Sequence, residues 1–121
     1  MKKILVIDDD VAFVGSMKAS LDKARYTVAS AKDGVEGLKQ MEEFRPDLIL
    51  LDIAMPAMDG IEFLKQVNKK YGEGKTPVLV TSNVSSLEKI SEGVSLGIRA
   101  YFMKSNESLK GISGIIDKVF E

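Results

Sequence analysis

The stretch Leu48-Ile-Leu-Leu-Asp-Ile-Ala-Met-Pro-Ala-Met-Asp-Gly60 decides the fold of this chain. It begins with four consecutive apolar residues, and the carboxylate of Asp52 follows them directly. A short apolar run that ends in turn-forming residues such as Pro56 and Gly60 is typical of a strand buried on both faces. Open α/β sheets bind their ligands outside the carboxyl ends of the strands, so we expect Asp52 to lie at a functional site.

The composition excludes several classes of protein. The chain has 121 residues, a formal net charge of -1, no Cys and no His. This length indicates one domain, residues 1–121, and we expect no output domain in the chain. The charge argues against nucleic-acid binding through bulk charge, and no apolar stretch approaches the roughly 20 residues of a membrane span. The lack of Cys is compatible with a reducing cytoplasm, and we expect a cytoplasmic protein.

Strand-like and helix-like segments alternate five times along the chain. Short apolar runs predict strands, and apolar residues at spacings of three and four predict helices, the first of them capped by Asp10. Such an alternation is typical of an α/β three-layer sandwich with a parallel sheet and right-handed crossovers. We predict strands at residues 4–7, 26–29, 48–52, 77–81 and 99–103, and helices at 11–24, from 35 to before Pro46, from 61 to near Gly72, 87–96 and 109–120.

Residues that can do chemistry gather at the carboxyl ends of the predicted strands. If the first and third strands are neighbours, three carboxylates share one pocket and raise one another's pKa. Mg2+ relieves this repulsion, because it prefers oxygen ligands and binds one or two carboxylates while keeping several waters. The residues at these strand ends are Asp8, Asp9, Asp52, Thr81, Ser82 and Lys104.

A pocket of this kind suits a phosphoryl group. Asp52 can attack phosphorus as a carboxylate nucleophile and form an aspartyl phosphate. The cation and Lys104 neutralise the phosphoryl oxygens as charge develops, and Thr81 can hydrogen-bond one of them. An ionised carboxylate needs no general base, which explains how a chain without His or Cys can react with a phosphoryl donor.

Taken together and in order, the motifs of this chain resemble the receiver domain of two-component response regulators, of the chemotaxis-response-regulator type. The resemblance covers essentially the whole chain and implies the flavodoxin-like (βα)5 fold, with a five-stranded parallel sheet in the order 2-1-3-4-5. The motifs that carry it are Ile4-Leu-Val-Ile-Asp-Asp-Asp10, Asp33-Gly34, Leu51-Asp-Ile-Ala-Met-Pro-Ala-Met-Asp-Gly60, Pro77-Val-Leu-Val-Thr-Ser82 and Ala100-Tyr-Phe-Met-Lys104.

The resemblance implies a metal site around the phosphoacceptor. Asp52 matches the phosphoacceptor, which accepts its phosphoryl group from a phosphohistidine on a sensor histidine kinase or a histidine phosphotransfer protein. Asp9 and Asp8 look like the Mg2+ pair, Asp9 as a direct ligand and Asp8 partly through water. Ala54 stands where the family donates a backbone carbonyl to the metal.

The resemblance also implies a switch. Lys104 matches the phosphate-binding lysine, with Thr81 and Ser82 beside the phosphate. Thr81 and Tyr101 match the switch hydroxyl and the switch aromatic, which change the surface of the fourth helix, fifth strand and fifth helix. The partners implied are the kinase and a downstream protein effector or fused output domain, with no direct contact to nucleic acid or a membrane. Such a signalling domain catalyses its own phosphorylation and dephosphorylation only.

Three positions near the pocket depart from the family pattern or vary within it. Ser105 follows Lys104, where the family usually has a Pro joined through a cis peptide bond. A non-proline cis bond costs roughly 3–4 kcal/mol. We nevertheless expect it to be retained, because Lys104 must still reach the pocket. Ala54 and Asn83 flank the pocket mouth, where the family tunes the lifetime of its phosphoryl group.

Two other functions remain open at this point. A phosphatase or phosphotransferase like the haloacid-dehalogenase-like hydrolases also uses an aspartyl intermediate. Those enzymes need a second Asp two residues after the nucleophile, and Ala54 occupies that position. A flavin-binding electron carrier needs a phosphate-cradling loop after the first strand, where three acids stand and would repel a phosphate.

Overall fold

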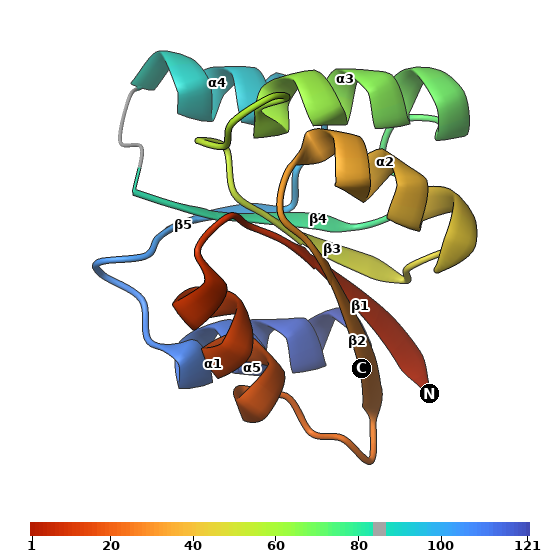
Figure 1. Ribbon diagram of the computed structural model, residues 1–121. Helices are drawn as coiled ribbons and strands as arrows, with labels where there is room; N and C mark the ends of the chain where they lie inside the picture. Colours follow the sequence, from red (N-terminus) through yellow and green to blue (C-terminus); the bar gives the residue numbers. More distant parts are fainter. Residues whose placement is uncertain (84–86) are drawn as a thin grey trace.

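The computed structural model describes residues 1–83 and 87–121. In this part of the chain five parallel strands form one sheet in the order β2-β1-β3-β4-β5, as predicted. Helices α2, α3 and α4 cover one face of the sheet, and α1 and α5 cover the other (Figure 1). The bounds are β1 Lys2–Ile7, α1 Val11–Ser20, β2 Tyr26–Ala31, α2 Gly34–Glu43, β3 Leu48–Leu51, α3 Gly60–Tyr71, β4 Val78–Ser82, α4 Leu87–Ser95, β5 Ala100–Met103 and α5 Leu109–Val119.

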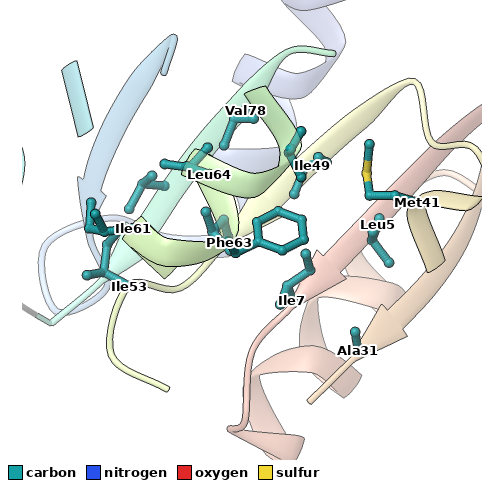
Figure 2. Packing of buried hydrophobic residues seen from close by; sticks show 13 residues of the cluster. Leu5, Ile7, Ala31, Met41, Ile49, Ile53, Ile61, Phe63, Leu64 and Val78 are labelled. Atoms are coloured by element: carbon teal, nitrogen blue, oxygen red, sulfur yellow. The ribbon is translucent and has the colours of Figure 1, made fainter. Parts of the chain in front are cut away.

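The central strands are apolar throughout because both of their faces are covered. Successive side chains of β1 point to opposite faces of the sheet, so Leu5 and Ile7 enter one core and Ile4 and Val6 enter the other. The first core lies under α2 and α3, and Figure 2 shows Phe63 of α3 at its centre. The second core contains Met17 from α1 and Ile112 and Ile116 from α5. This explains why the runs that predicted strands have no polar alternation.

Among the residues that the structure describes, side-chain caps precede four of the helices. Each capping oxygen accepts a hydrogen bond from the backbone N–H three residues further on, which satisfies a donor that the helix leaves unpaired. Such a cap contributes about 1 kcal/mol to helix stability. The prediction that Asp10 caps the first helix is confirmed. The capping pairs are Asp10 with Phe13 at 3.1 Å, Asp33 with Glu36 at 2.8 Å, Asp59 with Glu62 at 2.9 Å, and Ser108 with Gly111 at 2.9 Å.

The structure differs from the predicted boundaries around the first crossover. Helix α1 ends at Ser20 rather than near residue 24, because Leu21 has an extended backbone and Asp22 forms a turn. The Asp22 carboxylate accepts a hydrogen bond from the backbone N–H of Ala24 at 2.9 Å. Strand β2 continues to Ala31, two residues beyond the prediction, because it pairs with β1 along its whole length. These boundaries depend on strand pairing and turn contacts that apolar spacing does not report.

Two valines at apolar helix positions lie on the surface. Val35 is 57% exposed and Val94 is 62% exposed. In α2 the residue facing the sheet is Gly37, where a Cβ atom would lie 2.8 Å from Ile7 Cδ1 and 3.0 Å from Phe63 Cε1. In α4 Gly93 is buried against Ile98 in the same way. A glycine occupies the buried position of each of these helix turns, and the valine near it is therefore exposed.

Candidate functional site

Three carboxylates gather at the carboxyl ends of β1 and β3. Ile7 is paired with Leu51, so the next residues, Asp8 and Asp52, lie side by side. Oxygen atoms of Asp8, Asp9 and Asp52 lie within 4.8 Å of one another. Asp8 and Asp52 are buried, and Asp9 is exposed to solvent. The predicted acidic cluster is therefore present, and its oxygen ligands are of the kind that divalent cations such as Mg2+ prefer.

Backbone contacts fix Asp52 at this edge of the sheet. Its N–H donates to Ile7 O at 2.9 Å, and its carboxylate accepts a hydrogen bond from Ala54 N–H at 3.2 Å. The loop then folds back, and Gly60 N–H donates to Ile53 O at 2.9 Å. A Cβ atom on Gly60 would lie 2.5 Å from Asp52 O, so this approach requires glycine. Ala54 lies exposed at the mouth of the pocket.

The Lys104 ammonium reaches into the cluster. Its Nζ lies 2.6 Å from Asp8 Oδ2 and 3.6 Å from Asp52 Oδ2, and the side chain is 13% exposed. The expectation of a cis bond before Ser105 was wrong, because this peptide bond is trans. Lys104 N–H donates to Ser82 O at 3.0 Å, which continues the pairing of β4 with β5. The strand pairing thus carries the lysine to the pocket without a cis turn.

Burial and an excess of acid together determine the electrostatics of the pocket. Burial raises the pKa of Asp8 above its ordinary value, and the negative charge of Asp52 raises it further. Contacts with Lys104 and with the backbone N–H of Asp10 act in the opposite direction. Three carboxylates therefore share one ammonium in this cluster, which leaves a negative charge for a cation to neutralise.

The hydroxyls at the end of β4 have different surroundings. Thr81 is 1% exposed, and its Oγ1 has no hydrogen-bond partner among the residues that the structure describes. Ser82 is also buried, and its side chain hydrogen-bonds with Tyr101 on β5. Burial raises the pKa of the half-buried Tyr101, and the bond to Ser82 opposes this rise. A buried hydroxyl without a partner costs free energy, so Thr81 requires an explanation.

Sequence reasoning missed one residue that contacts the site. Phe13, in the first turn of α1, lies under the Lys104 ammonium, with Nζ 4.5 Å from the ring centroid. Phe13 lies within the helix predicted at residues 11–24, and its ring also packs against the second core. Its position, four residues after Asp9, was a signal that the helix turn nearest the acids carries this ring.

The larger hollows of the described surface lie away from these residues. Two of them, of about 480 and 760 Å³, lie beside α2 and α3 and share Lys70 and Tyr71 in their walls. A hollow of about 300 Å³ beside α1 includes Asp8 and Asp9 in its wall. Size therefore does not identify the site, and the convergence of polar groups at the strand ends does. No helix within the described ranges has the length and apolar character needed to cross a bilayer.

The fold and the site together define a class of protein. A doubly wound sheet with an acidic cluster and a lysine at its carboxyl edge is typical of domains that handle phosphoryl groups through a carboxylate. Residues 4–115 match the family model of the response regulator receiver domain. The chain belongs to this family and is a receiver domain of two-component response regulators. The recognition made from sequence motifs is confirmed.

Individual relatives agree with this assignment. The chain is 38% identical over 104 residues to the alkaline phosphatase synthesis transcriptional regulatory protein PhoP of Bacillus subtilis. The match covers 85% of this chain and 42% of that protein. It is 30% identical over 110 residues to the transcriptional regulatory protein YdfI of Bacillus subtilis, covering 89% of this chain and 50% of YdfI. The chain thus spans half or less of the length of these two relatives.

Solved structures agree as well. A receiver domain protein described as CheY-like, from Methanospirillum hungatei, superposes with a TM-score of 0.89 at 30% identity and covers 98% of this chain and 93% of its own. Chemotaxis protein CheY4 of Vibrio cholerae has a TM-score of 0.86 at 31% identity, with 98% of both chains covered. These findings give no support to the hydrolase alternative.

Proposed function

We propose that Asp52 is the phosphoacceptor of this receiver domain. The phosphoryl donor is a phosphohistidine on a sensor histidine kinase or a histidine phosphotransfer protein, which supplies the imidazole that this chain lacks. The observation that carries the proposal is the position of Asp52. Its carboxylate is buried at the carboxyl edge of the sheet, within 4.8 Å of the other two acids and 3.6 Å from the Lys104 ammonium. The carboxylate attacks phosphorus and expels the donor imidazole.

Asp8, Asp9 and Asp52, with the backbone carbonyl of Ala54, are the groups that would hold Mg2+. The donor set fits this ion, because it consists of hard oxygen ligands whose excess negative charge is not balanced by Lys104. Burial raises the pKa of Asp8, and the negative charge of Asp52 raises it further, so a cation beside this carboxylate would stabilise its ionised form. When bound, Mg2+ neutralises these carboxylates and the oxygens of the incoming phosphoryl group.

Thr81, Ser82 and Lys104 bind the phosphoryl oxygens. Within residues 1–83 and 87–121 the buried Thr81 hydroxyl has no hydrogen-bond partner, and it gains an acceptor when Asp52 carries phosphate, which explains why this hydroxyl is kept. Lys104 already lies between two carboxylates and needs a shift of its flexible side chain alone to contact a phosphoryl oxygen. These groups position and stabilise charge, so the domain catalyses its own phosphorylation and dephosphorylation.

Signalling then follows from a change in the surface formed by α4, β5 and α5. Thr81 moves toward the phosphoryl group, and Tyr101, bonded to the neighbouring Ser82, follows. The altered surface is read by a downstream effector protein or by an output domain of a longer protein. The single receiver domain, residues 1–121, is the unit that is phosphorylated.

Intact mass measurement tests the proposal. The wild-type protein is incubated with acetyl phosphate, phosphoramidate or a phosphohistidine protein, with and without Mg2+, beside Asp52→Asn and Asp59→Asn. Asp59 is the matched control, because it lies in the same loop and Asn preserves its role as a helix cap. We expect a Mg2+-dependent gain of one phosphoryl group in the wild type and the Asp59 variant, and none in Asp52→Asn. Equal labelling of Asp52→Asn, or no labelling of the wild type by any donor, would refute the assignment.

A further inference from the structure

Lys104 has an aromatic neighbour that the proposed function does not use. Its ammonium lies 4.5 Å from the centroid of the Phe13 ring, in addition to its contacts with Asp8 and Asp52. We propose that Phe13 is a positioning residue that holds the Lys104 ammonium within reach of Asp52 before phosphoryl transfer. This inference rests on the proposed role of Asp52 as the phosphoacceptor.

The ring is fixed by the scaffold, whereas the ammonium is at the end of a flexible chain. Phe13 lies in the first turn of α1, and its backbone N–H is bound by the Asp10 cap at 3.1 Å. Its half-buried ring packs against the second core. Lys104 is anchored through its backbone to Ser82, and its side chain must reach the pocket from there. Phe13 therefore defines a place for the ammonium that does not depend on the carboxylates.

The chemistry of the ring suits this role. An ammonium over an aromatic face is attracted by the ring quadrupole, and the attraction grows when water is excluded, as it is around this largely buried side chain. The ring carries no charge and binds neither a metal ion nor a phosphoryl group. It remains a partner for Lys104 when the carboxylate of Asp8 is engaged by a cation.

The sequence after the lysine makes such support useful. Ser105 follows Lys104 through a trans peptide bond, so no proline ring restricts the backbone at this point. Without Phe13, the ammonium has two carboxylates and solvent as its alternatives. The Phe13 ring disfavours movement of the ammonium into solvent, so the ammonium stays near Asp52.

Phe13→Leu tests the inference, with Phe13→Tyr as the conservative variant that keeps the ring. Phe120→Leu is the matched control, because Phe120 is also half-buried and lies 5.4 Å from the ammonium of Lys2, far from the pocket. The first measurement is the NMR chemical shift of the Lys104 ε protons, which a ring face moves upfield. We expect the upfield shift in the wild type, Phe13→Tyr and Phe120→Leu, and its loss in Phe13→Leu.

The second measurement is the initial rate of phosphorylation by acetyl phosphate at saturating Mg2+. We expect Phe13→Leu to be about fivefold slower, as for one partly desolvated cation–π contact. Phe13→Tyr and Phe120→Leu should keep the wild-type rate. In a Lys104→Met background the same Phe13→Leu substitution should have no further effect, because the ring acts through the lysine.

Two outcomes would overturn the inference. One is a Lys104 shift that does not change in Phe13→Leu, since the contact would then be absent in solution. The other is an equal slowing by Phe13→Leu with and without Lys104, which would mark a structural role for the ring. A wild-type protein that no donor phosphorylates would overturn the proposed function instead, and the NMR measurement would still decide whether the contact exists.

Discussion

Replacing Thr81 by Val removes one oxygen atom from the interior and keeps the shape of the side chain. Thr81 is 1% exposed, and its Oγ1 has no hydrogen-bond partner within the described part of the chain. An unsatisfied buried hydroxyl costs about 1–3 kcal/mol relative to an apolar group of the same shape. We therefore expect Thr81→Val to raise the free energy of unfolding of the phosphate-free protein by about 1–2 kcal/mol.

Urea unfolding followed by far-ultraviolet circular dichroism measures this change, since the chain has no Trp for fluorescence. With a slope of about 2 kcal/mol per M of urea, the midpoint should rise by roughly 0.5–1 M at an unchanged slope. Ser82→Ala is the matched comparison, because this hydroxyl is buried beside Thr81 but hydrogen-bonds with Tyr101. Its loss should lower the free energy of unfolding by about 1 kcal/mol.

An unchanged or lower midpoint for Thr81→Val would refute the reasoning. It would mean that the hydroxyl has a partner in solution, such as a bound water, and that the unphosphorylated fold bears no cost for keeping it. The expected result instead describes a residue that destabilises the resting domain and is kept for the phosphorylated one. Stability and signalling would then oppose each other at this position.

Three further predictions concern stability. Burial raises the pKa of Asp8, so the ionised carboxylate opposes folding. Asp8→Asn should therefore have a higher melting temperature than the wild type at pH 7. The difference in melting temperature should shrink as the pH falls toward 3.8, the ordinary pKa of the Asp side chain. Ala57 has a left-handed backbone with a φ of 64°, so Ala57→Gly should raise the free energy of unfolding, measured with urea, by about 0.5–1 kcal/mol. Arg45, with a φ of 53°, lies away from the site, and Arg45→Gly should have the same effect. The Tyr26 hydroxyl donates to Asp117 at 2.5 Å, so Tyr26→Phe should lose about 1 kcal/mol of stability at neutral pH. Burial and this bond raise the pKa of Tyr26 from 10.0 to about 12, so in unfolding experiments the loss should disappear as the pH rises through this interval.

Much of the fold was predictable because its signals are local. The apolar run from Leu48 to Leu51 marks a central strand without reference to any other segment, and Asp52 follows it at the sheet edge where ligands bind. The acidic cluster was predictable for the same reason, since parallel strands bring their carboxyl ends to one edge. What the sequence did not report depends on contacts between distant segments. The place of Phe13 under Lys104, which is 91 residues later, is one example.

The sequence also did not predict the backbone conformation after Lys104 or the close approach of α2 to the sheet. The peptide bond after Lys104 was expected to be cis by analogy with a proline that this chain lacks. The structure needs no such bond, because the pairing of Ser82 with Met103 already directs the lysine to the pocket. The apolar pattern also gave no signal for Gly37, because glycine has no apolar side chain. It is nevertheless the residue that lets α2 approach Ile7.

The edge of the sheet opposite the pocket is closed by a small set of side chains. Asp117 near the end of α5 pairs with Arg25 at 3.1 Å and accepts the Tyr26 hydroxyl, while Lys2 lies over the ring of Phe120. These residues join the starts of two strands to the end of the last helix, far from the acids. Substitutions among these residues can therefore change the stability of the domain without touching the acids at the other end of the strands.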